Sequence, residues 1–181
     1  MNRMKKKDMP VGQYTFETKN IEGATENFLE ETAPLIGYIV HSFNTLEELL
    51  NSAICELFYD SSDTKGLLVI YRMNYAAKVD LFKRFVLDEQ KCLGKKMLSF
   101  DKFIGNLISA GKLRNTVVHA DWESAHDDGY TLCRLKLNSK GLQHEYVQFT
   151  SQSLQSILQL IDQTCEMFDV YEEEHEELFS G

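Results

Sequence analysis

The stretch LIGYIVHSFNTLEELLNSAICELFY (residues 35–59) sets the fold class of this chain. Its apolar residues recur at spacings of three and four, which places them along one side of an α-helix. A helix with such a stripe buries it against other helices. Pro34 stands directly before the stretch, and proline is favoured in the first turn of a helix. We therefore expect this helix to begin at Pro34, after a shorter helix over residues 21–31, and to end at residues 60–63 (DSSD).

Further segments repeat the helical spacing. The pattern predicts helices over residues 74–86 and 100–119, and a final helix that is capped by Thr150 or Ser151 and ends in YEEEHEELF. Between the first two long helices, GLLVIYRM is apolar throughout, so it fits either a short strand or an apolar lead-in to the next helix. The chain therefore predicts four or five helices.

The period changes over residues 130–149. Apolar and polar residues alternate loosely from Tyr130, NSKG follows at 138–141, and a second short apolar run ends at Phe149. This arrangement is typical of a β-hairpin. We therefore predict an all-α, up-and-down helical bundle with a small β-hairpin inserted before the last helix. Residues 1–20 are expected to form a flexible N-terminal tail, and residues 21–181 a single helical domain.

Composition and charge narrow the classes of function. The 181 residues carry a formal net charge of −9 and a pI near 5.0, which argues against a protein that coats nucleic acid nonspecifically. A small basic cleft is compatible with this total, and Lys5 to Lys7 are either a solvated tail or an RNA-contacting arm. The four cysteines form no CxxC pair and are expected to be buried thiols. No secretory signal or membrane-spanning run is apparent, so we expect a cytoplasmic protein without membrane contact.

The stretch KLRNTVVHADW (residues 112–122) places polar side chains where a buried helix is expected to continue. Arg114 and His119 are five positions apart, so they diverge by roughly 140° around the helix, whereas Asn115 and His119 share one side. One interpretation is structural, because arginine and histidine near a helix C-terminus complement the helix dipole and the last carbonyl groups.

The second interpretation is chemical. Gly111 removes side-chain bulk, so a second copy of this helix could cross there and bring two sets of these residues into one cleft. Arginine offers a permanent cation with a fork that matches phosphate, and histidine transfers protons near neutral pH. Asn115 could bind phosphate or orient the imidazole. Two such sets suffice to cleave RNA through attack by its own 2′-hydroxyl, without a metal or another cofactor.

The stretch LRNTVVHADW (residues 113–122) resembles the signature of HEPN-domain proteins, in which an arginine and a polar residue precede a histidine near the end of a core helix. The resemblance covers roughly residues 34–179 and implies a dimeric helical bundle whose motifs meet at the interface. It implies a metal-independent endoribonuclease of a toxin–antitoxin, phage-defence or RNA-processing system, with Arg114 on the scissile phosphate, His119 in proton transfer and Asn115 in support. A non-catalytic RNA-binding or protein-interaction module, such as a partner of an antitoxin or regulatory protein, is the alternative. The hairpin at residues 130–149 departs from the minimal form of the family, and could contact the substrate or a partner or be simply a decoration of the fold.

Two neighbouring features have weaker chemical interpretations. His126, Asp127 and Asp128 follow Asp121, but no second cluster supports a metal site, so none is predicted. Trp122 is expected to pack over the end of the motif helix, with stacking on an RNA base as the alternative.

Overall fold

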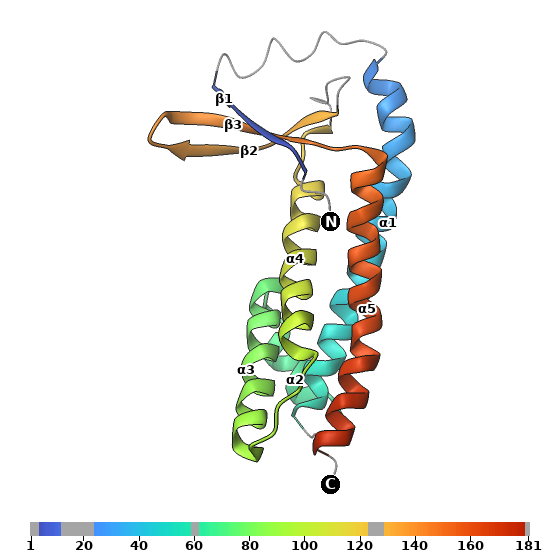
Figure 1. Ribbon diagram of the computed structural model, residues 1–181, viewed down its shortest axis with the longest axis vertical. Helices are drawn as coiled ribbons and strands as arrows, with labels where there is room; N and C mark the ends of the chain where they lie inside the picture. The colour runs from blue at the N-terminus through green and yellow to red at the C-terminus, as the bar shows by residue number, and fades with distance from the viewer. Residues whose placement is uncertain (1–3, 12–23, 59–61, 123–128, 180–181) are drawn as a thin grey trace. The chain divides into compact units, whose positions relative to one another are not determined.

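The computed structural model describes residues 4–11, 24–58, 62–122 and 129–179 (Figure 1). The described chain is mostly helical and carries one small antiparallel sheet. The elements in chain order are β1 (Lys6–Pro10), α1 (Ala24–Glu56), α2 (Thr64–Ile70), α3 (Tyr75–Leu93), α4 (Phe100–Val118), β2 (Tyr130–Asn138), β3 (Gly141–Gln148) and α5 (Ser151–Phe179). Among the described helices, none combines the length and the apolar character needed to cross a membrane.

The chain divides into two compact units, which are described separately. The first unit comprises Met1–Val40 and Leu113–Leu158, and the second comprises His41–Lys112 and Gln159–Gly181. The first unit therefore holds the sheet and the end of α4, and the second holds α2 and α3. The helices α1, α4 and α5 contribute residues to both units.

Helix α1 differs from the sequence prediction at both ends. It runs without interruption through Pro34, so the predicted separate helix over residues 21–31 is wrong. Proline in a helix interior deprives the carbonyl group four residues earlier of its partner. Here that residue is Glu30, and both Glu30 and Pro34 are exposed, so water can replace the missing hydrogen bond. The helix ends at Glu56, earlier than predicted.

The ambiguous apolar run after residue 65 is helical rather than a strand. It forms α2, whose Gly66 packs so closely on Cys55 that a Cβ atom would stand 2.7 Å from the Cys55 Cα atom. The next helix, α3, starts as its sequence predicts, because Asn74 Oδ1 accepts a hydrogen bond from the Ala77 amide at 3.0 Å. It continues past the predicted end to Leu93 and stops at Gly94, which adopts a left-handed conformation (φ 64°).

Aromatic rings form the core of the second unit. Phe82 and Phe103 are fully buried, and Phe168 is almost so. Phe103 lies 4.8 Å from Phe168 and 6.1 Å from Phe82 between ring centroids, with near-perpendicular planes in both pairs. Edge-to-face pairs of this kind contribute beyond their buried area. This unit is thus held together mainly by apolar packing.

The sheet of the first unit has three strands in the order β1–β3–β2, one more than the predicted hairpin (Figure 1). Strands β2 and β3 confirm the hairpin, and Thr150 confirms the predicted cap of α5 by accepting a hydrogen bond from the Ser153 amide at 3.1 Å. The additional strand β1 comes from the segment that was predicted to be a flexible tail. It pairs antiparallel with β3, so this part of the tail is ordered by long-range backbone hydrogen bonds.

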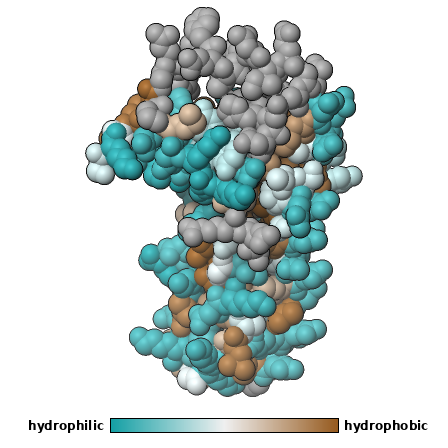
Figure 2. Space-filling view, turned by 45° about the horizontal axis from the view of Figure 1, so that its top comes forward, coloured by the Kyte–Doolittle hydropathy of each residue, from teal (hydrophilic) through white to brown (hydrophobic). Residues whose placement is uncertain are grey.

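The two faces of the sheet differ in character. Side chains alternate between faces along each strand, and directly paired residues share a face. The register places four exposed apolar residues on one face: Met9, Leu135, Leu137 and Leu142. It places charged residues on the other: Lys6, Asp8, Arg134, Lys136 and Glu145. Figure 2 shows that hydrophilic residues predominate on the described surface in view, with hydrophobic residues in separate patches.

The cysteines follow the prediction only in part. All four are free thiols, and Cys55 is buried. Cys133 and Cys165 are half-buried, and Cys92 is exposed. Cys92 lies in the last turn of α3, where its side chain is exposed to solvent.

Candidate functional site at the end of helix α4

Trp122 closes the C-terminal end of α4. Its indole Nε1 donates a hydrogen bond to the Val117 carbonyl oxygen at 3.0 Å, which satisfies one of the last carbonyl groups of the helix. The ring lies 4.9 Å from that of Phe149 and 6.3 Å from that of Phe28, measured between centroids. These contacts confirm that Trp122 packs over the end of the motif helix, and the same packing fixes the point at which the chain leaves it.

His119 stands one residue beyond the last residue of α4, and its amide still donates to the Asn115 carbonyl oxygen at 3.1 Å. Two residues later, the Asp121 amide donates to the Leu132 carbonyl oxygen at 2.7 Å and forms an isolated antiparallel bridge with β2. The short link between helix and bridge leaves the histidine beside β2. Strand β2 of the hairpin therefore lies directly beside the link that carries His119.

A groove with a cavity volume of about 140 Å³ lies at this junction. The described residues that line it come from the link and from β2: His119, Asp121, Leu132, Cys133, Arg134 and Leu135. His119 and Arg134 are both exposed. The groove thus combines an accessible imidazole with a guanidinium group, the two side-chain types that are needed for proton transfer and for phosphate binding.

Arg134 is held in place by Glu145 on the adjacent strand. Its Nε donates to Glu145 Oε1 at 3.0 Å, and its Nη2 donates to Oε2 at 3.4 Å. The Glu145 side chain is only 5% exposed, whereas that of Arg134 is 64% exposed. Nη1 takes no part in this bidentate contact. A buried carboxylate therefore fixes the orientation of an arginine that faces solvent.

Glu145 stays ionised because of the cations around it. Burial alone raises the pKa of this carboxyl group, but the hydrogen bond from Arg134 and the charges of Lys6, Arg134 and Lys136 lower it below its ordinary value. Lys6 and Lys136 each lie 3.5 Å from a Glu145 oxygen. The carboxylate is therefore available as a fixed negative charge at any pH near neutrality.

Cys133 lines the groove but is unsuited to nucleophilic chemistry. Burial raises the pKa of its thiol to about 11, so the thiol is protonated at neutral pH. Because the thiolate is the reactive form of cysteine, this side chain contributes shape rather than reactivity.

The predicted trio is divided by the structure. Arg114 is half-buried and donates from Nη1 to Asn115 Oδ1 at 3.2 Å, so these two side chains are brought together. Neither is among the described residues that line the groove, whereas His119 is. Arg134 was not identified from the sequence, which reveals the alternation of β2 but not that its register brings this residue beside His119.

Gly111 has a different neighbour from the one expected. A Cβ atom at this position would stand 2.7 Å from the Tyr75 ring, and the Tyr75 hydroxyl group donates to the Leu107 carbonyl oxygen at 3.1 Å. The space at the glycine is therefore occupied by α3 of the same chain. A second copy of α4 cannot cross at this point, because the position is already covered.

Metal ligands are not grouped in the part of the chain that the structure describes: no three or more His, Cys, Asp or Glu residues there are placed to hold an ion. The residues His126, Asp127 and Asp128, considered above for a metal site, lie outside the described residues.

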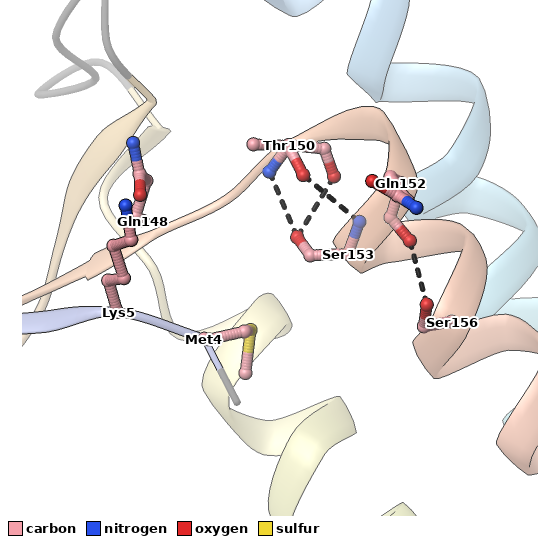
Figure 3. Close-up of a pocket in the computed structure, with 7 residues that line it drawn as sticks. All are labelled: Met4, Lys5, Gln148, Thr150, Gln152, Ser153 and Ser156. Carbon is pink, nitrogen blue, oxygen red and sulfur yellow. Dashed lines mark hydrogen bonds between the residues drawn. The ribbon is translucent and has the colours of Figure 1, made fainter. Parts of the chain in front are cut away.

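A larger cavity of about 540 Å³ lies in the first unit, between β1 and the start of α5 (Figure 3). Polar and apolar surface contribute about equally to its lining, which consists of Met4, Lys5, Gln148, Thr150, Gln152, Ser153 and Ser156. Figure 3 shows reciprocal hydrogen bonds between Thr150 and Ser153. The Thr150 amide donates to the Ser153 hydroxyl oxygen at 2.9 Å, and the Ser153 amide donates to the Thr150 hydroxyl oxygen at 3.1 Å. These hydroxyl groups serve as helix caps, which explains their presence here without a ligand.

No protein-family model matches the chain. Neither the curated proteins nor the solved structures contain a match to it.

Proposed function

We propose that this protein is a metal-independent endoribonuclease of the HEPN type, which acts in a toxin–antitoxin or phage-defence system. The observation that carries the proposal is the groove in which an exposed His119 lies beside the anchored Arg134. The acidic total charge does not oppose this, because a permanent cation, Arg134, lines the groove together with the carboxyl group of Asp121.

The reaction follows from the groups present. His119 accepts the proton of a ribose 2′-hydroxyl group, and the 2′-oxygen attacks the adjacent phosphorus atom. The bond from phosphorus to the 5′-oxygen breaks, and the 5′-oxygen receives a proton. One product therefore begins with a 5′-hydroxyl group, and the other ends in a 2′,3′-cyclic phosphate. Arg134 stabilises the charge that develops on the phosphate oxygens, and Arg114 with Asn115 supports the phosphate or the flanking backbone.

The proton for the leaving oxygen calls for a second acid. We propose that a homodimer supplies it, with the histidine of the second copy on the opposite side of the phosphate. The two copies meet through the first unit, near the end of α4, since Gly111 is covered by Tyr75. A single copy would then bind RNA but cleave it poorly.

The test is cleavage of a labelled RNA by the purified protein in EDTA. His119→Ala is expected to lower the cleavage rate by at least about 100-fold, the usual range for loss of a general acid–base group. The matched control is His41→Ala, because His41 is also an exposed histidine but lies in the second unit. The end group of the product distinguishes the mechanism, since only 2′-hydroxyl attack gives a cyclic phosphate. Cleavage that persists in His119→Ala would contradict the assignment.

A second candidate is a non-catalytic protein-interaction module. The observation that favours it is the apolar face of the sheet, where Leu137 is 79% and Leu135 50% exposed. Apolar patches of this kind mark contacts with other proteins. In this case Leu137→Ser would abolish binding of a regulatory protein from the same system, while His119→Ala would not.

A further inference from the structure

Positive charge is concentrated on the sheet of this acidic protein. Residues 4–11 and 129–149 contain six lysine or arginine residues and two acidic residues, a net charge of +4. Since the whole chain carries −9, the remaining residues carry −13. An anion that approaches the protein is therefore attracted to the sheet and repelled from the rest.

The cations of the sheet extend from the groove toward the hairpin turn. Arg134 lines the groove, and Lys136 lies two residues further along β2 on the same face. Residues two apart on a strand are about 7 Å apart. Lys140 follows in the turn and is exposed. This succession forms a basic track of Arg134, Lys136 and Lys140 that begins at His119.

Two carboxylates set how much of this charge is available. Glu145 is buried and holds Arg134, Lys6 and Lys136 at the surface. Asp8 lies at the edge strand β1, and its Oδ2 accepts a hydrogen bond from Lys136 Nζ at 3.0 Å. The Asp8 carboxylate is thus paired with Lys136, the lysine that an incoming phosphate would bind, and it competes with such a ligand.

We infer that single-stranded RNA binds along the basic track on β2, with successive phosphates on Lys140, Lys136 and Arg134, and thereby enters the groove at His119. The inference rests on the proposed function for the choice of RNA as the anion. It adds the path of the substrate and gives the inserted hairpin a role in binding. Lys136 and Lys140 position the RNA backbone and do not take part in the chemical step.

The experiment measures binding separately from cleavage. The probe is a fluorescent 2′-O-methyl RNA of mixed sequence and about 12 nucleotides, a length within the range of single-strand sites. It cannot be cleaved by 2′-hydroxyl attack, so the wild-type protein can be titrated directly by fluorescence anisotropy at several salt concentrations. Lys136→Gln/Lys140→Gln is expected to weaken binding and to reduce the slope of log K against log salt by about 1.4, the value for two lost phosphate contacts on a single strand.

Two further variants make the result specific. Lys83→Gln/Lys102→Gln removes the same charge from exposed positions of α3 and α4 and should leave binding unchanged. Asp8→Asn removes the competing carboxylate from Lys136 and should tighten binding. If Lys136 only stabilised the sheet, Asp8→Asn would weaken binding as Lys136→Gln does, and this would overturn the inference. If the double variant misfolds, the single variant Lys140→Gln can be measured instead, because Lys140 is exposed in the turn and its substitution should not disturb the fold.

The remaining outcomes separate this inference from the proposed function. If the sheet variants weaken RNA binding but the wild type does not cleave ordinary RNA, the nuclease function is wrong and the RNA-binding track is supported. If cleavage depends on His119 and the sheet variants change neither cleavage nor binding, the nuclease function is supported and the track is wrong. If the wild type binds no RNA, the track is wrong, and the charge of the sheet suits an acidic protein surface instead.

Discussion

Phe103 and Glu145 are both almost completely buried, but the two units of the molecule surround them in different ways. Phe103 is 0% exposed and contacts other aromatic rings of the second unit. Glu145 is 4% exposed and contacts three cations of the first unit. Burial of an apolar side chain is favourable by itself, whereas burial of a charge must be offset by its partners.

The difference indicates where stability and chemistry are located. A large aromatic side chain contributes about 1.5–3 kcal/mol by leaving water. The partners of Glu145 are largely solvated, with Arg134 64% exposed, so screening reduces these ion pairs to about 1 kcal/mol or less. Apolar packing therefore dominates the stability of the second unit, whereas the sheet of the first unit keeps charged groups at its surface, where a ligand can reach them.

The largest expected effect follows from removal of a ring from the aromatic core. Phe103→Ala should lower the free energy of unfolding by about 3–5 kcal/mol, because it leaves a cavity among rings that cannot close it. The control is Leu98→Ala, since Leu98 is 87% exposed and should change stability by less than about 0.5 kcal/mol. Urea titration followed by circular dichroism measures both. Equal effects of the two substitutions would contradict the assignment of the core.

A smaller effect is expected where the backbone, rather than packing, sets the geometry of the first unit. Gly129 has φ 78°, and a Cβ atom there would overlap the carbonyl oxygen of Phe149. Its own carbonyl oxygen accepts a hydrogen bond from the Phe149 amide at 2.8 Å. Gly129→Ala should therefore cost roughly 1–3 kcal/mol and displace Phe149 from Trp122.

Gly141→Ala is the matched control for this substitution. Gly141 also has a positive φ, of 93°, but nothing lies within 4 Å of the position of its Cβ atom. The difference between the two variants in thermal unfolding isolates the steric contribution. If Gly141→Ala were the more destabilising of the two, the close approach at Gly129 would not be the reason that glycine is required there.

The helices and the hairpin could be predicted because their signals are local. The spacing of apolar residues gave the main helices, and the change of period at Tyr130 gave β2 and β3. Strand β1 could not be predicted, because Lys6 to Pro10 shows no alternation of its own and pairs only through contacts with β3, more than 130 residues away in sequence. The continuation of α1 through Pro34 was missed because its tolerance depends on exposure, which a sequence does not show.

The candidate site was only partly accessible to sequence reasoning for the same reason. His119 was identified by its spacing from Arg114, but its neighbour Arg134 depends on the register of the hairpin and on the bulge after Leu132. Glu174 is a second example. It accepts hydrogen bonds from the Ser99 amide at 3.3 Å and from the Ser99 hydroxyl group, across 75 positions. The run of glutamates at the end of α5 carries no local signal of a partner 75 positions away.

The smallest expected effect compares the pH dependence of two carboxyl groups. Surrounding cations lower the pKa of Glu145 despite its burial, so its ionised form stabilises the fold above the unfolded value of 4.5, and this contribution is lost as the pH falls through the lowered pKa. Burial, Glu172 and Asp63 raise the pKa of Glu56, so its ionised form is unfavourable at neutral pH.

Glu145→Gln should therefore lower the free energy of unfolding at pH 7 by about 1 kcal/mol or less and flatten its decline below about pH 5. Glu56→Gln should raise this free energy at pH 7 and leave it nearly unchanged in acid. Urea titrations at a series of pH values test both, and a Glu145→Gln variant that loses stability as steeply in acid as the wild type would show that the cations around this carboxylate do not hold it ionised.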